Sequence, residues 1–104
     1  MKTTSLKDIR HASPPPDGDE YKLAYVEADL AGRLAELVYT LRTAAGLTQT
    51  ELARRMGTTQ SSIARLEGAA HVPTLDVLVR LGAATGTPIA INTSKGHTVH
   101  LNTA

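Results

Sequence analysis

Gln60, Ser61 and Arg65 are polar or basic residues in a short segment whose apolar positions, Ile63 and Leu66, lie at helical spacing. A Gln amide can hydrogen-bond N6 and N7 of adenine together, and an Arg guanidinium can bond O6 and N7 of guanine. Each such pair discriminates between bases by about 1–3 kcal/mol. The chemistry that these side chains suit is therefore the recognition of base edges in the DNA major groove.

A helix must present these side chains, and the sequence predicts two short helices joined by a tight turn. Thr48 followed by Glu51 is a capping box, and such a cap stabilises a helix by about 1 kcal/mol. Gly57 provides the left-handed backbone conformation that ends this first helix. Arg54 and Arg55 point away from its apolar face, so we expect them to serve solubility and general phosphate attraction. The residues of that apolar face are Leu52, Ala53 and Met56.

The second helix begins after Thr58 and Thr59, both of which are suitable N-cap residues. The first turn of a recognition helix reaches base edges, and the N-terminus of the preceding helix attracts a phosphate. A pair of helices with two caps, a small residue at the crossing and a glycine at the turn is a strong indication of DNA binding. The candidate DNA-binding residues are Gln49, Thr59, Gln60, Ser61, Ser62 and Arg65.

The segment 49–68 resembles the helix-turn-helix of Xre/Cro-type repressors, and the run 57–63 is especially similar to lambdoid phage repressors. The resemblance covers roughly residues 34–84 and implies a mainly α, lambda-repressor-like helical bundle. By position, it makes Gln49 a phosphate contact, and it makes Gln60, Ser61 and Arg65 base-facing residues. The chain departs from the family in the loop 68–73, which lacks Lys and Arg, and beyond residue 86, where a fifth helix is expected.

The same resemblance implies a structural pair between Arg42 and Glu67, which ties the first helix of the bundle to the end of the recognition helix. Removing one partner of a buried pair costs about 3–5 kcal/mol, because the other charge is left uncompensated. We therefore expect substitution of Glu67 to lower stability before it alters base preference.

The composition indicates one small domain with an aliphatic core, since the 104 residues include no Phe, no Trp and no Cys. The lack of Cys excludes disulfides and thiolate metal sites and is typical of a reducing compartment. No apolar stretch has the length of a membrane span or of a secretory signal, so we expect a cytoplasmic protein without a membrane partner.

Charge is distributed unevenly along the chain. Residues 1–30 carry four Lys and Arg against six Asp and Glu, whereas residues 31–104 carry seven against four. The expected DNA-binding part is therefore mildly basic and the leader acidic. Since few phosphate contacts are available per subunit, useful affinity requires a homodimer on a two-fold site of double-stranded operator DNA.

We predict three segments. Residues 1–18, with three consecutive prolines, form a flexible N-terminal arm, in which Leu6 and Ile9 either contact a partner or are unstructured. Residues 19–86 form a helical DNA-binding domain with an N-terminal helical extension, as one long helix or as two in series around Gly32. Its last helix begins at Pro73 and Thr74 and ends before residue 86. The apolar face of that helix consists of Leu75, Leu78, Val79 and Leu81.

Residues 87–104 change to a period of two and predict a β-hairpin. A lone two-stranded hairpin is marginal in water, so we expect it to complete a sheet across a dimer axis or against a partner. His97 and His100 face opposite sides of an extended segment and cannot chelate a metal together. No catalytic arrangement, metal site or cofactor motif is present, which indicates a non-enzymatic protein. The expected dimerisation residues are Ile89, Ile91, Val99 and Leu101.

Three functions fit these features. The bundle, the N-terminal extension and the C-terminal β-element together resemble antitoxins of HigA type, which neutralise a RelE/ParE-like (HigB-type) toxin and repress their own operon. That resemblance implies toxin binding through the extension. A stand-alone Xre-family repressor, whose extension serves dimerisation or a small ligand, is the alternative. A protein-interaction module that has lost DNA binding is the third. The candidate toxin-binding residues are Leu6, Ile9, Tyr21, Tyr25 and Val26.

Overall fold

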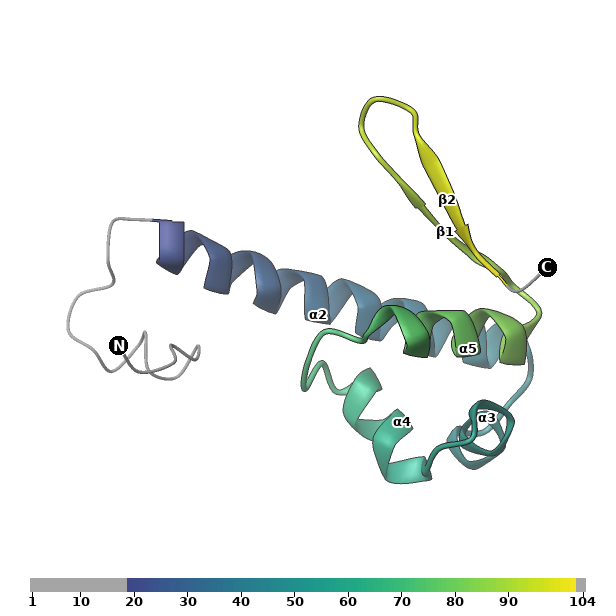
Figure 1. Ribbon diagram of the computed structural model, residues 1–104. Helices are drawn as coiled ribbons and strands as arrows, with labels where there is room; N and C mark the ends of the chain where they lie inside the picture. Colours follow the sequence, from purple (N-terminus) through teal and green to yellow (C-terminus); the bar gives the residue numbers. More distant parts are fainter. Residues whose placement is uncertain (1–18, 103–104) are drawn as a thin grey trace.

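The computed structural model describes residues 19–102, so the predicted arm at residues 1–18, with Leu6 and Ile9, lies outside the described residues. The described part is mainly helical and ends in an antiparallel hairpin (Figure 1), which confirms the predicted fold class. The elements, in chain order, are α2 (Asp19–Ala44), α3 (Gln49–Met56), α4 (Gln60–Glu67), α5 (Leu75–Thr85), β1 (Ile89–Asn92) and β2 (Thr98–Leu101).

The N-terminal extension and the first helix of the bundle are one continuous helix, α2. Its 26 residues make it about 39 Å long. It passes Gly32 without a break, and a Cβ added to Gly32 would meet no atom within 4 Å. The buried residues of α2 are Ala31, Ala35 and Val38, and none of them precedes the middle of the helix. The N-terminal half therefore continues beyond the core.

Local signals in the sequence set the ends of α3 and α4. The Thr48 hydroxyl accepts the Glu51 amide at 3.0 Å, and Glu51 Oε1 accepts the Thr48 amide at 2.8 Å, which completes the capping box. Gly57 ends α3 in the left-handed region, with φ of 71°. Thr59, not Thr58, is the N-cap of α4. These caps confirm the predicted pair of short helices joined by a tight turn.

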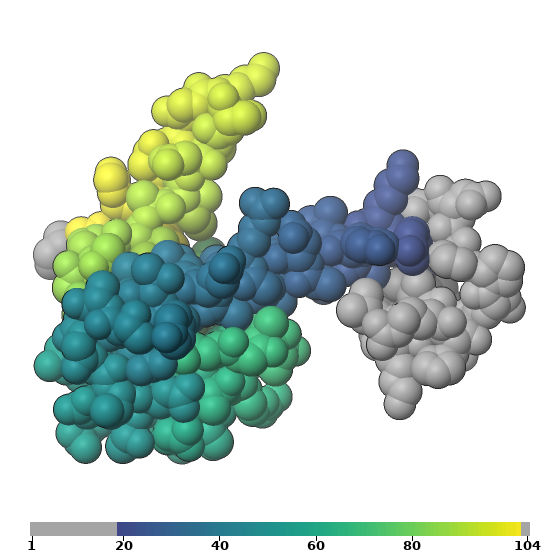
Figure 2. All heavy atoms as spheres, turned by 180° about the vertical axis from the view of Figure 1, so that it is seen from behind, coloured from purple at the N-terminus to yellow at the C-terminus, as the bar shows by residue number. Residues whose placement is uncertain are grey.

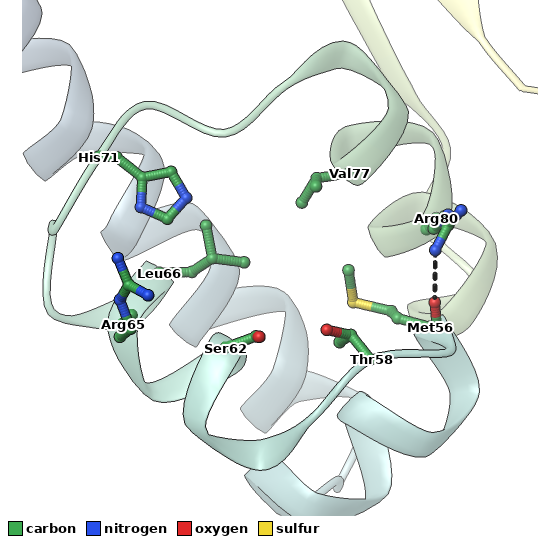
Figure 3. A pocket seen from close by; sticks show the side chains of 8 residues that line it. All are labelled: Met56, Thr58, Ser62, Arg65, Leu66, His71, Val77 and Arg80. Carbon is green, nitrogen blue, oxygen red and sulfur yellow. Dashed lines mark hydrogen bonds between the residues drawn. The ribbon is translucent and has the colours of Figure 1, made fainter.

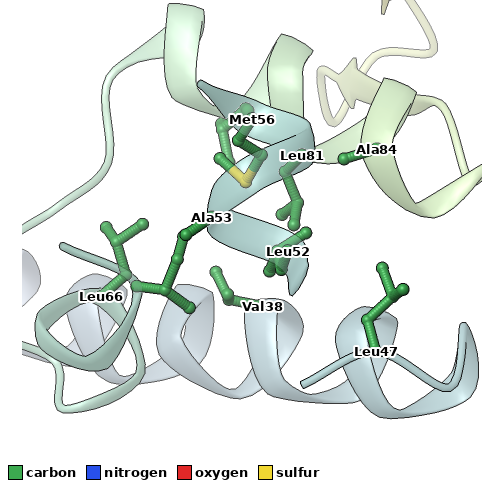
Figure 4. Close-up of a cluster of buried hydrophobic side chains, with 10 residues drawn as sticks. Val38, Leu47, Leu52, Ala53, Met56, Leu66, Leu81 and Ala84 are labelled. Carbon is green, nitrogen blue, oxygen red and sulfur yellow. The ribbon is translucent and has the colours of Figure 1, made fainter. Parts of the chain in front are cut away.

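The core lies between α2, α3, α4 and α5 (Figure 4). Its largest fully buried side chains come from four different helices: Val38, Leu52, Ile63 and Leu81. Leu78 is buried as predicted, but Leu75 is 58% exposed, so its predicted place on the apolar face of α5 is wrong. Leu75 directly follows the N-cap Thr74, in the first turn, before the helix reaches its neighbours.

The hairpin is anchored on α5 through a close approach at Gly82. A Cβ at this position would meet backbone atoms: the Thr87 carbonyl oxygen at 3.1 Å, the Ile89 amide nitrogen at 3.3 Å and Pro88 Cα at 3.3 Å. Residue 82 must therefore lack a side chain for the backbone to cross the helix there. Gly86, with φ of 72°, ends α5 and turns the chain into β1.

The strand register places all four predicted dimerisation residues on one face of the hairpin. Ile89 pairs with Leu101, and Ile91 pairs with Val99. Ile89 and Leu101 pack against the core, whereas Ile91 and Val99 are 42% and 61% exposed. The apolar face thus runs from the bundle out into solvent.

Two elements project from the bundle in different directions: the hairpin and the N-terminal half of α2 (Figure 2). They extend the molecule to 45 × 36 × 22 Å, with a radius of gyration of 16.0 Å. A compact domain of about 100 residues has a radius of gyration of about 13 Å. Both projections carry exposed apolar side chains, including Leu23, Val26 and Val99.

Candidate nucleic-acid interface

An ion pair joins α2 to the end of α4. Arg42 Nε lies 2.6 Å from Glu67 Oε2 and Arg42 Nη2 lies 3.0 Å from Oε1, so the guanidinium and carboxylate meet in a fork. The side chains are only 13% and 8% exposed. Arg42 Nη1 also donates to the Leu47 carbonyl oxygen at 2.9 Å. These are the two residues that the family resemblance pairs, and the contact joins α2 to the end of α4.

The polar contacts continue from this ion pair to the start of the recognition helix. Gln49 Nε2 donates to Glu67 Oε1 at 3.0 Å, and Gln49 Oε1 accepts a hydrogen bond from Gln60 Nε2 at 2.7 Å. Gln49 is the first residue of α3 and Gln60 is the first residue of α4. Four side chains from three helices thus form one chain of hydrogen bonds that ends at an exposed amide.

Hydrogen bonds and charges in this region shift the pKa values of three acidic and basic side chains. Burial raises the pKa of Glu67, but hydrogen bonds from Arg42 and Gln49 and the Arg42 charge outweigh it, so that the pKa lies below its ordinary value. The hydrogen bond to Glu67 raises the pKa of Arg42. In the capping box, the hydrogen bond from the Thr48 amide lowers the pKa of Glu51. Glu67 is therefore ionised at neutral pH and holds both of its partners.

Thr59 organises the N-terminus of α4. Its hydroxyl oxygen accepts a hydrogen bond from the Ser62 backbone amide at 3.2 Å. The same oxygen lies 2.9 Å from the Ser62 hydroxyl oxygen and 3.2 Å from the Ser61 hydroxyl oxygen. Three of the predicted DNA-binding residues are thus grouped by one cap. Thr59 and Ser61 are exposed and Ser62 is half-buried, which leaves hydroxyl groups accessible beside Gln60.

The predicted base-facing residues lie on an accessible part of α4. Gln60, Ser61 and Arg65 are all exposed, while Ile63 and Leu66 of the same helix are buried. No carboxylate occurs in α4 before Glu67, and that group is neutralised by Arg42. The exposed face of the helix offers an amide, hydroxyls and a guanidinium, which are the groups that bind base edges and phosphates.

The arrangement of α3 and α4 agrees with the family comparison. The family described as "Helix-turn-helix domain" matches residues 33–90, from the C-terminal half of α2 to the start of β1, which is more than half of the chain. The chain belongs to the helix-turn-helix domain family. No curated protein and no solved structure matches it. The match supports an Xre-like domain, and a domain of this kind binds DNA sequence-specifically and is typical of regulators without an enzymatic activity.

Two arginines of the helix-turn-helix domain have positions that the sequence did not indicate. Arg55 is exposed, as expected, but its Nη1 also donates a hydrogen bond to the Ala84 carbonyl oxygen, near the end of α5, at 3.1 Å. Arg80 of α5 donates in return to the Met56 carbonyl oxygen, at the end of α3, at 3.3 Å. Each cation thus satisfies a terminal carbonyl of the other helix. Helical periodicity indicates which way Arg55 points, but it cannot show that another helix ends there.

The predicted toxin-binding residues that the structure describes lie on the projecting part of α2. On α2, the Tyr21 and Tyr25 rings pack edge to face with centroids 5.3 Å apart, and Tyr25 and Val26 are 64% and 60% exposed.

Among residues 19–102, no group of three or more His, Cys, Asp or Glu side chains is placed to hold a metal ion. None of the helices in that range is long and apolar enough to cross a membrane.

Proposed function

We propose that this protein is a cytoplasmic transcriptional repressor that binds a two-fold DNA operator as a homodimer. The observation that carries the proposal is the Gln60 amide, which is held by Gln49 at the exposed start of the recognition helix. Gln60 reads adenine and Arg65 reads guanine in each half-site. The N-terminus of α3 at Gln49 receives a backbone phosphate, because its first amide groups have no partner within the helix.

Dimerisation uses the exposed part of the hairpin face formed by Ile89, Ile91, Val99 and Leu101. Support for this comes from the exposure of Ile91 and Val99 next to two residues that are anchored on the core. Two copies that join these faces bury the apolar residues of both hairpins. A two-fold arrangement also places two recognition helices on successive half-sites, about one helical turn of DNA apart.

Selection of preferred duplexes from a random pool tests the proposal. We expect the wild-type protein to select a two-fold sequence. Gln60→Ala and Arg65→Ala should each lose discrimination at one base pair per half-site, by about 1–3 kcal/mol. Arg33→Ala is the matched control, since it removes an exposed cation that pairs with Asp29 on α2. The proposal fails if both substituted proteins select the same sequence as the wild type with the same stringency.

We further propose that the repressor is an antitoxin of HigA type, with α2 as the element that binds a RelE/ParE-like (HigB-type) toxin. The N-terminal half of α2 exposes Leu23, Tyr25 and Val26, each by more than half of its surface. The part of α2 before its first buried residue, Ala31, has no side chain in the core, and a helical segment of only about 12 residues is marginal in water, so it gains stability from a partner. These exposed apolar residues give the protein a larger interaction surface than DNA binding requires.

Growth of cells that express the small open reading frame next to this gene tests the finer proposal. We expect arrest that the full chain relieves and that the Val26→Asp protein does not. Glu36→Gln is the control on the same helix, within the family-matched segment. Absence of arrest, or arrest that the full chain does not relieve, leaves the alternative, a stand-alone Xre-family repressor. Relief that persists in a protein unable to bind DNA would be consistent with a separate toxin-binding surface.

A further inference from the structure

A cavity of about 320 Å³ opens beside the recognition helix, between the end of α3, one side of α4 and α5 (Figure 3). Its apolar wall is formed by Met56, Leu66 and Val77. Met56 and Leu66 are 4% and 5% exposed and belong to the core, so this wall is fixed by packing. The volume lies at the lower end of the range of small-molecule sites, about 300–1,000 Å³.

The polar part of the lining is basic. Arg65, His71 and Arg80 line the cavity, and none of the described residues that line it carries a carboxylate. Arg80 is already committed, because its Nε pairs with Asp76 at 3.1 Å. Arg65 and His71 have no ion-pair partner among residues 19–102, and Figure 3 shows their side chains on the same side of the opening. This side of the cavity therefore attracts an anion.

We propose that the cavity binds a small organic acid. Arg65 holds the carboxylate in a fork, His71 adds a hydrogen bond, and the short hydrocarbon body lies against Leu66 and Val77. The hydroxyls of Thr58 and Ser62, which also line the cavity, supply further hydrogen bonds. A DNA phosphate would use the same cations, but it has no hydrocarbon part to cover the apolar wall, so the lining favours an organic acid.

Binding of the acid releases DNA, because Arg65 cannot engage a ligand carboxylate and a guanine at once. This regulatory part rests on the proposed function, in which Arg65 reads a base. The cavity and the base-reading face share α4, so the ligand acts through direct competition for one side chain. No change in the arrangement of the helices is required.

Titration of the full-length, ¹⁵N-labelled protein with hexanoate, followed by amide NMR shifts, tests the site. We expect saturable shifts confined to residues around the cavity, and affinity at least tenfold above that of neutral hexanamide and of acetate, which lacks the apolar body. Arg65→Gln should weaken hexanoate binding at least fivefold, and Arg33→Gln should leave it unchanged. Absence of saturable shifts, or equal binding of hexanoate and hexanamide, would overturn the proposal. Inorganic phosphate that binds as tightly as hexanoate would overturn it in favour of a phosphate subsite.

A variant that fills the cavity separates ligand binding from DNA binding. Val77→Phe should retain a dispersed amide spectrum and normal operator affinity while losing hexanoate binding. Saturating hexanoate should weaken operator binding by the wild-type protein at least fivefold and leave the Val77→Phe protein unaffected. Hexanoate that binds the cavity without weakening operator binding overturns the regulatory part alone. A protein that binds no operator overturns the proposed function, while the titration still decides the cavity.

Discussion

Gln60 Nε2 donates a hydrogen bond of 2.7 Å to Gln49 Oε1, which joins the first residues of the two helices of the helix-turn-helix. Gln49 is held in turn by Glu67, and Glu67 by Arg42. The orientation of the Gln60 amide is therefore set by protein contacts before DNA is present. Such preorganisation favours recognition, because less side-chain freedom is lost on binding.

Substitution of Gln49 tests this arrangement. We expect Gln49→Ala to reduce discrimination at the base pair that faces Gln60 by about 0.5–1.5 kcal/mol, the contribution of one hydrogen bond, besides weakening phosphate contact. Binding to variant half-sites measures the effect. In the Gln60→Ala background, Gln49→Ala should change affinity equally for all half-sites. An equal change already in the wild-type background would show that Gln49 does not position Gln60.

Loss of Glu67 should destabilise the fold strongly. Glu67→Ala leaves the Arg42 guanidinium, only 13% exposed, without its carboxylate, and breaking such a pair costs about 3–5 kcal/mol. Urea unfolding measures the free energy. Glu36→Ala, at an exposed position of α2, is the control and should change stability by less than about 0.5 kcal/mol. Equal midpoints for the two proteins would show that the pair contributes nothing.

The lowered pKa of Glu67 predicts how stability depends on pH. Because its folded-state pKa lies below the ordinary value of 4.5, its contribution is complete above about pH 4.5 and is lost as the pH falls through the folded-state pKa. Thermal unfolding of the wild type and of Glu67→Gln should therefore differ most at neutral pH and converge in acid. A difference that stays constant from neutral pH into acid would contradict the assignment.

Two glycines should respond oppositely to the same substitution. Gly82→Ala forces a Cβ against backbone atoms of residues 87–89 and should destabilise the protein by about 1–3 kcal/mol. Gly32→Ala adds its Cβ in open space within a helix and should stabilise by about 0.5–1 kcal/mol. Thermal unfolding of both variants measures this. A stabilising Gly82→Ala would show that the hairpin does not cross α5 closely.

Charges on the apolar hairpin face should separate the proposed dimer. We expect Ile91→Asp and Val99→Asp to give monomers and to weaken operator binding, because each dimer would bury two carboxylates. Sedimentation measures the mass. His100→Asp, on the opposite face of the same hairpin, is the matched control and should remain dimeric. Dimers of unchanged affinity in all three proteins would place the interface elsewhere.

The parts of the fold that short-range chemistry determines could be predicted from the sequence. The capping box at Thr48, the left-handed Gly57 and the alternation after Pro88 each depend on neighbouring residues, and the structure has all three features. Likewise, the exposure of Gln60, Ser61 and Arg65 follows from helical periodicity once Ile63 and Leu66 are buried. The Arg42–Glu67 pair was reached through the family resemblance, since 25 residues separate its partners.

Contacts between distant segments could not be predicted in the same way. Arg55 reaches the end of α5 because the ends of two helices lie close together in space. No pattern in the neighbouring sequence indicates this proximity. The cavity has the same origin, as it combines Thr58, His71 and Val77 from three separate segments. Leu75 shows the opposite case. Its apolar side chain has the helical spacing of a core residue, but it is exposed because it lies beyond the end of the core.

The three tyrosines, Tyr21, Tyr25 and Tyr39, are the only aromatic residues of the chain, and all lie on α2. Without tryptophan, the native near-ultraviolet fluorescence of this protein therefore originates in a single helix. Tyr21 and Tyr25 lie on its projecting end. The ring centroid of Tyr39 lies 5.3 Å from Cζ of the Arg42 guanidinium. A partner seated on the projection would alter the first two signals, and disruption of the ion pair would alter the third. The molecule thus contains an intrinsic optical reporter for both events, with no dye attached.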